Sequence, residues 1–185
     1  MNKNSLKFIV AVLTIFHFFI YLSCSEESRV PATNLELRDS LIYTKGSDIP
    51  FSGREYARIE NKIIEYDVVD GVKHGEFLLY YESGKLEIKG ELVNNLNEGR
   101  WQYYYESGQI ESEGDFVDNQ PDGIWRWYYR SGKLREEGLF QKGKRQGVWK
   151  EFDELGIVLN EKDYSIPDSL STPSDILINL KNPTD

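Results

Sequence analysis

Residues 99–116 read GRWQYYYESGQIESEGDF, and this stretch decides the fold. Within it, Ile110, Ser112, Gly114 and Phe116 alternate with acidic residues, the period of two that is typical of a half-buried β-strand. If residues 100–105 also form a strand, Trp101, Tyr103 and Tyr105 fall on one face and Gln102 and Tyr104 on the other. The segment between these two stretches contains Gly108, which adopts positive φ without steric cost and so suits a tight turn. The stretch therefore predicts a β-hairpin.

The same pattern recurs along the chain with a fixed period. A recurring period of this size indicates a repeat array, in which each unit buries its apolar surface against its neighbours. We therefore predict an all-β fold, an antiparallel meander of β-hairpins with a 24-residue period. The positions that keep the period are Gly75, Gly99, Gly123 and Gly147; Gly84, Gly108, Gly132 and Gly156; Gly90, Gly114 and Gly138; and the aromatic residues Phe77, Trp101, Trp125 and Trp149.

The third glycine series falls inside the expected strands, where glycine ordinarily weakens a strand. Recurrence at one phase indicates that each of these glycines makes room for a bulky neighbour. We predict that the rings of Trp101, Trp125 and Trp149 lie across the in-strand glycines of adjacent strands.

The first 23 residues have the pattern of a signal peptide. Lys3 and Lys7 precede an almost wholly apolar run over residues 8–22, which is too short for a permanent span of a hydrocarbon core about 30 Å thick. Leu22-Ser23-Cys24 resembles a bacterial lipobox, although Tyr21 replaces its usual leucine, and this resemblance implies lipid attachment at Cys24. The alternative is an ordinary signal peptide with a cysteine nearby.

The residues after the cysteine, Ser25-Glu26-Glu27-Ser28, resemble the surface-display signal of Bacteroidetes lipoproteins. A solvated tether is the alternative. The resemblance implies a cell-envelope protein of the outer membrane, anchored through lipid chains on Cys24, and leaves surface exposure open.

The rest of the chain divides by composition. We expect a polar linker over residues 24–41, the repeat domain over 42–164 with a degenerate first unit over 42–74, and a C-terminal tail over 165–185. Within the tail, Ile176–Leu180 is a candidate short strand against the array.

The repeated motif Gly-x-Trp-x-x-Tyr-Tyr-x-Ser-Gly-x-Leu-x-x-x-Gly-x-Phe resembles the MORN repeat variant of bacterial YwqK-like, antitoxin-annotated proteins. The resemblance covers about residues 42–164. It implies a β-hairpin array that contacts other molecules. Antitoxins of the usual kind neutralise cytosolic toxins, which does not suit an exported chain, so an envelope antitoxin or immunity-type partner is kept as an alternative.

Composition argues against several classes of function. The chain has 22 basic and 31 acidic residues, a net charge of −9, so phosphate backbones would repel it and no nucleic-acid partner is expected. Beyond the signal peptide His74 is the sole histidine, and Cys24 is assigned to lipidation. Residues 118–123 read as a second, longer turn and lack the ligand pattern of a calcium loop. We therefore expect no catalytic residues, no metal and no cofactor, and hence no enzyme.

The aromatic residues are the candidate binding surface. Tyr80, Tyr104 and Tyr128 are predicted to form one cross-strand ladder, with Trp127 and the neighbouring Arg126 as further candidate contacts. Tyr81, Tyr105 and Tyr129 are expected on the opposite face, with the Trp and Phe rings. The first hypothesis is a protein-binding or scaffolding lipoprotein. A carbohydrate-binding lipoprotein, which would use exposed rings as a stacking surface, is the second.

Overall fold

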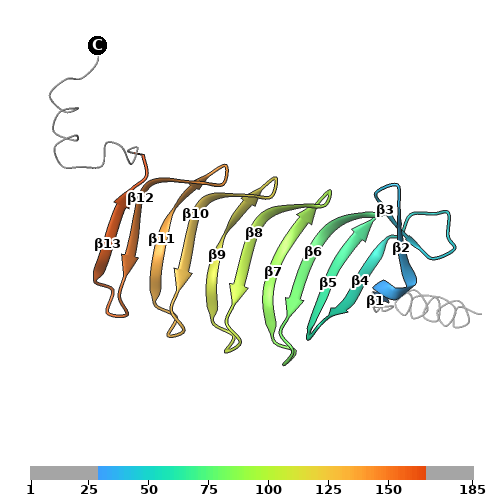
Figure 1. Cartoon of the computed structure of the whole chain (residues 1–185), viewed down its shortest axis with the longest axis horizontal. Coiled ribbons are helices and arrows are strands. Elements are labelled where there is room, and N and C mark those ends of the chain that lie inside the picture. Colours follow the sequence, from blue (N-terminus) through green and yellow to red (C-terminus); the bar gives the residue numbers. More distant parts are fainter. Residues whose placement is uncertain (1–28, 166–185) are drawn as a thin grey trace, which may run out of the picture.

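The computed structural model describes residues 29–165, which form one long sheet, antiparallel except for its first strand pair, with a small hairpin at its first end (Figure 1). The all-β prediction is confirmed, because every element in this range is a strand except one short 3-10 helix, η1 (Ala32–Asn34). No helix within it is long and apolar enough to cross a membrane. The expected signal peptide, Cys24 and Ile176–Leu180 lie outside the described residues. The strands are β1 (Arg29–Pro31), β2 (Leu35–Arg38), β3 (Leu41–Thr44), β4 (Gly53–Ile59), β5 (Lys62–Val69), β6 (Val72–Tyr80), β7 (Leu86–Val93), β8 (Leu96–Tyr104), β9 (Ile110–Val117), β10 (Gln120–Tyr128), β11 (Leu134–Gln141), β12 (Lys144–Phe152) and β13 (Val158–Asp163).

The strand bounds themselves repeat with the period of the sequence. Strands β6, β8, β10 and β12 begin at residues 72, 96, 120 and 144, and each pairs only with its neighbours in sequence. Gly84, Gly108, Gly132 and Gly156 close one set of turns with φ between 80° and 95°, as predicted.

The second set of turns differs from the expectation over residues 118–123. The turn itself is only Asp118–Asn119, whose φ values are 50° and 64°, and residues 120–123 already belong to β10. Two consecutive residues with positive φ make the two-residue turn that matches the twist of the flanking strands. Aspartate and asparagine tolerate this conformation, so a glycine is not needed to close the turn.

The sheet has two distinct faces, since successive side chains of a strand alternate sides. We call the side that carries Trp101, Trp125 and Trp149 the aromatic face, and the side that carries Gln102, Arg126 and Lys150 the charged face. On the aromatic face the rings make a chain of contacts along the array. Phe116 lies edge-on to Trp125 at 5.2 Å between centroids. Phe140 lies edge-on to Trp149 at 5.0 Å.

The prediction that tryptophans lie across the in-strand glycines is confirmed at all three positions. A Cβ atom added to Gly90 would lie 2.3 Å from the ring of Trp101. The corresponding distances are 2.2 Å from Gly114 to Trp125 and 2.1 Å from Gly138 to Trp149. The three indoles are only 3–5% exposed although the sheet is a single layer over these strands. Each indole is therefore buried by lying flat on a strand that lacks a side chain beneath it.

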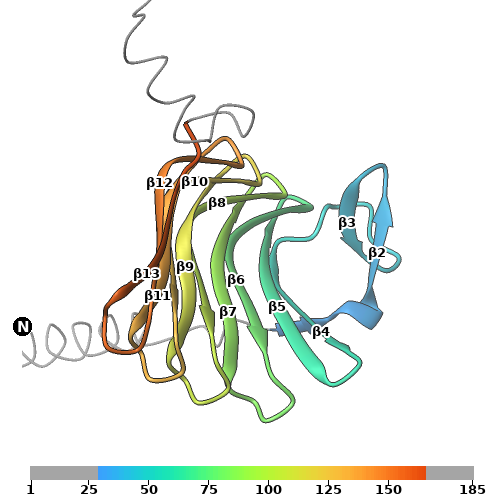
Figure 2. The same ribbon diagram turned by 60° about the vertical axis from the view of Figure 1, so that its left-hand side comes forward.

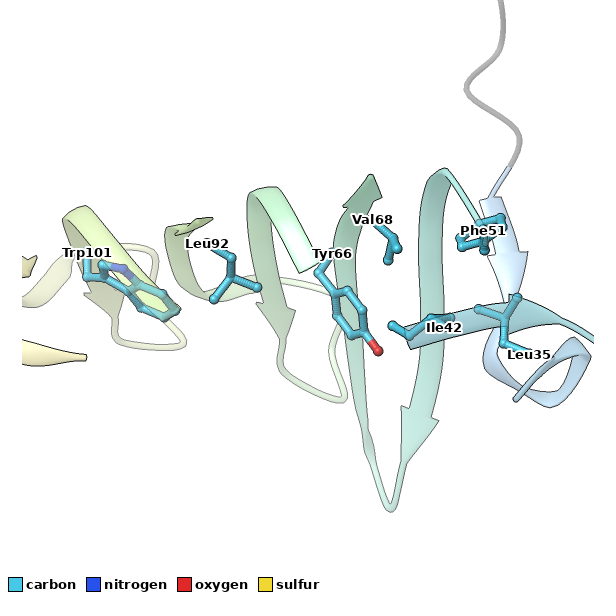
Figure 3. Close-up of a cluster of buried hydrophobic side chains, with 7 residues drawn as sticks. All are labelled: Leu35, Ile42, Phe51, Tyr66, Val68, Leu92 and Trp101. Carbon is cyan, nitrogen blue, oxygen red and sulfur yellow. The ribbon is translucent and has the colours of Figure 1, made fainter. Parts of the chain in front are cut away.

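The first end of the array is closed by residues that the sequence predicted to be linker. Strand β1 pairs in parallel with β4, and β2 and β3 form a separate hairpin beside it (Figure 2). Leu35 and Ile42 from this hairpin are buried in one cluster with Tyr66 and Val68 of the array (Figure 3). The linker prediction over 24–41 is thus wrong from residue 29 onward. The few apolar residues of this polar segment, such as Leu35, are buried against apolar side chains at the first end of the array.

A tyrosine hydroxyl fastens each repeat to the next. The hydroxyl of Tyr81 donates to the carbonyl of Tyr104 at 2.6 Å, and that of Tyr105 donates to the carbonyl of Tyr128 at the same distance. Tyr129 donates to the carbonyl of Phe152 at 2.8 Å. Each bond satisfies a carbonyl at the end of a strand, where the ladder stops.

Replacing Tyr105 with Phe should lower the free energy of unfolding by about 1 kcal/mol, the usual net contribution of one hydrogen bond, with some added cost for the carbonyl left unpaired. Chemical denaturation of the two proteins measures the difference. Tyr103→Phe is the matched control, since its hydroxyl makes no hydrogen bond with the described residues, and it should change stability little. Equal effects of the two substitutions would contradict the inter-repeat bond.

Candidate binding surfaces

The predicted tyrosine ladder is only partly reproduced. Tyr80, Tyr104 and Tyr128 all lie half-buried on the charged face, at the ends of β6, β8 and β10. Strands β7 and β9 separate them, so the three rings are not direct cross-strand neighbours. This detail is wrong because the 24-residue unit contains two strands, which puts equivalent positions on every second strand. The Tyr104 hydroxyl donates to Gln102 Oε1 at 3.0 Å, and that of Tyr128 donates to Glu113 Oε1 at 2.9 Å.

The remaining candidates lie on opposite sides of the sheet. Arg126 is on the charged face, where its Nε atom lies 3.2 Å from Glu137 Oε2. Trp127 is on the aromatic face, with ring centroids 5.7 Å from Trp125 and 5.6 Å from Trp149. Two adjacent residues of a strand cannot serve one flat surface. The five predicted contact residues therefore belong to two different surfaces.

An alternating row of charges crosses the charged face, and it was not predicted from the sequence. Neighbouring strands align Gln102, Glu113, Arg126, Glu137, Lys150 and Glu161 in direct register. The periodic signal was present, because the acidic positions 113, 137 and 161 recur at the same step as the glycines. Opposite charges placed directly across a sheet stabilise the pairing, so this row helps to fix the register of the strands.

A buried arginine holds three carboxylates together near the first end of the array. Arg54 on β4 is 7% exposed, and its guanidinium nitrogens lie 2.7 Å from Asp67, 2.9 Å from Glu76 and 3.3 Å from Glu65. Glu65 is itself buried, and Arg29 of β1 contacts its other oxygen at 3.0 Å. Buried charges are tolerated only when they are paired in this way.

Two carboxylates of the charged face have pKa values below their ordinary range. The hydrogen bond from Lys89, aided by Arg54, lowers the pKa of Glu76 despite the cost of partial burial. Burial opposes ionisation of Glu113, but hydrogen bonds from Gln102 and Tyr128 and the charge of Arg100 outweigh it and lower the pKa.

These shifts predict acid destabilisation. A group whose pKa is lowered by folding adds stability above its unfolded pKa, and that stability is lost as pH falls through the folded pKa. We expect the free energy of unfolding to stay nearly constant from pH 7 down to about pH 5. It should then decrease as the pH falls below 4.5, the ordinary pKa of glutamate. Denaturation at several pH values measures the slope, and Glu113→Gln should reduce it. A slope unchanged in that variant would contradict the assignment.

Two grooves open on the charged face at equivalent places in the array. The first, of about 290 Å³, is lined mainly by charged residues, among them Glu76, Lys89, Glu91 and Arg100. The second, of about 430 Å³, lies two repeats further along and has Ile124, Leu139 and Val148 in its lining. The same backbone thus presents charged chemistry at one place and apolar chemistry at the other.

The aromatic face offers a second surface. Tyr103, Phe116, Trp127 and Phe140 are half-buried, and over β8–β12 no other strand or helix among residues 29–165 packs against them. The β2–β3 hairpin covers this face only toward the first end of the array. The rings thus form a continuous apolar strip that is partly exposed to solvent.

Within the described residues, no group of three His, Cys, Asp or Glu side chains is arranged to hold a metal ion. His74, at the start of the array, is exposed. The chemistry that the described surfaces support is contact through rings, apolar side chains and paired charges.

The comparison with known families agrees with this architecture. The MORN repeat variant family matches three stretches of the chain, residues 73–94, 97–118 and 121–142. No curated protein matches. Among solved structures, the chain is similar to one in the "Glycosylation Associate Protein (Gap123) complex from Streptococcus agalactiae", with 11% sequence identity and a TM-score of 0.36. That match covers 89% of this chain but only 29% of the other, so this chain spans less than a third of its length. Each family match runs from one of the even-numbered strands into the strand that follows it, and residues 73–142 are thus an array of three MORN repeat variants.

Proposed function

We propose that the chain is a non-enzymatic lipoprotein of the cell envelope whose MORN array binds a partner protein through the aromatic face. One observation carries the proposal: a strip of half-buried rings runs along β8–β12 on a face that the described residues leave uncovered. Large rings supply contact area at low conformational cost, which is why Trp and Tyr are enriched at the centres of protein interfaces.

The rigidity of the strip supports this reading. Trp127 is held between Trp125 and Trp149, whose ring centroids lie 5.7 Å and 5.6 Å from its own. A partner would therefore meet a surface that is already ordered, and binding would not have to order it. The anchor proposed at Cys24 would keep that surface at the membrane, where multiple acyl chains bind stably.

Photo-crosslinking tests the binding surface. A photoreactive phenylalanine at position 127 in the full chain should give a discrete protein adduct in cells of the native host. The same probe at Leu159, exposed on the edge strand β13, is the control and should not give that adduct. Absence of a protein adduct from position 127 would overturn the proposal. Quenching of tryptophan fluorescence by a polysaccharide, lost in Trp127→Ala, would replace the protein partner by a glycan.

Lipid labelling tests the anchor. Radiolabelled palmitate should enter the wild-type chain and not the Cys24→Ala variant. Digestion of the labelled protein by protease added to intact cells would place the array on the cell surface, and protection would place it in the periplasm. Equal labelling of both proteins, or none in either, would remove the lipoprotein part of the proposal.

A further inference from the structure

The apolar groove on the charged face is a second surface, separate from the aromatic strip. Ile124, Leu139 and Val148 lie on β10, β11 and β12 and are 42%, 40% and 44% exposed. Ile124 and Leu139 are direct cross-strand partners. We call these three residues, with the groove that they line, the third-repeat groove. Contiguous exposed apolar side chains are candidates for a binding site.

The repeats themselves show that the fold does not require apolar residues there. The Ile124–Leu139 pair corresponds, one period earlier, to Arg100 and Asp115, which are also direct partners. One further period back, the same pair is Glu76 and Glu91. Two repeats keep the same backbone with charged side chains at these positions. The apolar residues of the third repeat are therefore not required by the backbone.

The rim of the groove selects the charge of an occupant. Among the residues that line the groove, Arg126 and Lys150 are positive and Glu137 is negative, so the lining itself has a net positive charge, although the row continues with Glu113 and Glu161 on either side. The side chains of Arg126 and Lys150 are 40% and 43% exposed in surface ion pairs, which contribute little and are readily exchanged. The groove thus suits an apolar segment that carries an acidic residue.

We propose that the occupant is the segment Asp175–Leu180 of this same chain. Its sequence, Asp-Ile-Leu-Ile-Asn-Leu, places one acidic residue beside four apolar ones. The described chain ends at Ser165, two residues after Asp163, which is the direct cross-strand partner of Val148 in the groove. The nine intervening residues reach roughly 30 Å when extended. Strand β10 is three strands from β13, a separation of only about 14 Å.

Tethering favours this occupant over a second copy. A short covalent connection gives an effective concentration in the millimolar range, so even weak side-chain contacts fill the groove. Two copies, by contrast, would have to bring together chains that each have a charge of −9. This docking does not depend on the function proposed for the aromatic face.

Methyl NMR of the full chain tests the proposal from the tail side. In the Ile176→Ser/Leu177→Ser/Ile178→Ser variant, the methyl resonances of Ile124, Leu139 and Val148 should shift, and those of Ile64 at the other end of the sheet should not. Leu170→Ser, in the same tail but outside the segment, is the control and should leave the groove methyls in place. Groove methyls that do not respond to the triple substitution would overturn the proposal.

A transplant tests it from the groove side. Ile124→Arg/Leu139→Asp installs the charged pair that the second repeat already carries, so the fold should be retained. The amide resonances of residues 176–180 should then move to the positions they have in an isolated peptide of that sequence, whereas Leu155→Asp outside the groove should leave them unchanged. Amide resonances of residues 176–180 that do not move in this variant would overturn the proposal. Groove shifts that depend on protein concentration would assign the groove to a second copy instead.

Discussion

The Gly114→Val variant should unfold at a temperature roughly 10 °C below that of the wild type, a loss of about 3 kcal/mol for a domain of this size. Its Cβ atom alone would lie 2.2 Å from the indole of Trp125, and the two γ-methyl groups would need still more room. The indole cannot move aside freely, because Phe116 and Phe140 lie edge-on to it. Thermal unfolding followed by circular dichroism measures the difference.

The control for this variant is Glu111→Val on the same strand β9. It places a valine on the charged face, away from the indoles, and valine favours strands. Its unfolding temperature should change by no more than a few degrees. A second control couples the partners: Trp125→Leu should make Gly114→Ala less damaging than it is alone. If the stability changes of the two substitutions simply add, the absence of a side chain at Gly114 is not needed to accommodate the indole of Trp125.

Replacing Arg54 with Met should lower the free energy of unfolding by about 3–5 kcal/mol, because the buried carboxylates around the missing guanidinium lose their positive partner. Glu65 is the most severely affected, since it is almost fully buried and, among residues 29–165, keeps only Arg29 as a cationic partner. Urea denaturation at pH 7 should show a lower midpoint with an unchanged slope.

Arg100→Met is the matched control. Arg100 also contacts two carboxylates, Glu113 at 3.1 Å and Asp115 at 3.5 Å, but its side chain is 42% exposed. Exposed pairs of this kind contribute about 1 kcal/mol or less. Removing the buried partner as well, in Arg54→Met/Glu65→Leu, should restore part of the lost stability. Similar costs for the two single arginine variants would contradict the buried network.

The sequence predicted the repeat well because its signals are local. Turn glycines, alternating side chains and the placement of Trp125 over Gly114 all follow from residues within one or two periods. The N-terminal hairpin was missed because Leu35 and Ile42 gain their burial from the end of the array and not from their own segment. The candidate site was predicted as one surface because Trp127 and Arg126 are adjacent in sequence, although neighbouring strand residues face opposite ways.

The apolar groove could not be predicted from its own residues either. Ile124, Leu139 and Val148 look like ordinary strand residues until the register places them together beside the charged row. Comparison among the repeats was the available signal, since the equivalent residues Arg100 and Asp115 are charged.

The tyrosine bond from one repeat to the next has a consequence for how such a chain changes size. Tyr105 reaches only the following unit, and each indole covers only the glycine of the preceding strand. A duplicated repeat unit inserted at a repeat boundary would make the same contacts on both sides, and the contacts at the two ends of the array would not change. The length of the aromatic strip is therefore a quantity that gene duplication can alter in whole steps, while the two ends stay as they are.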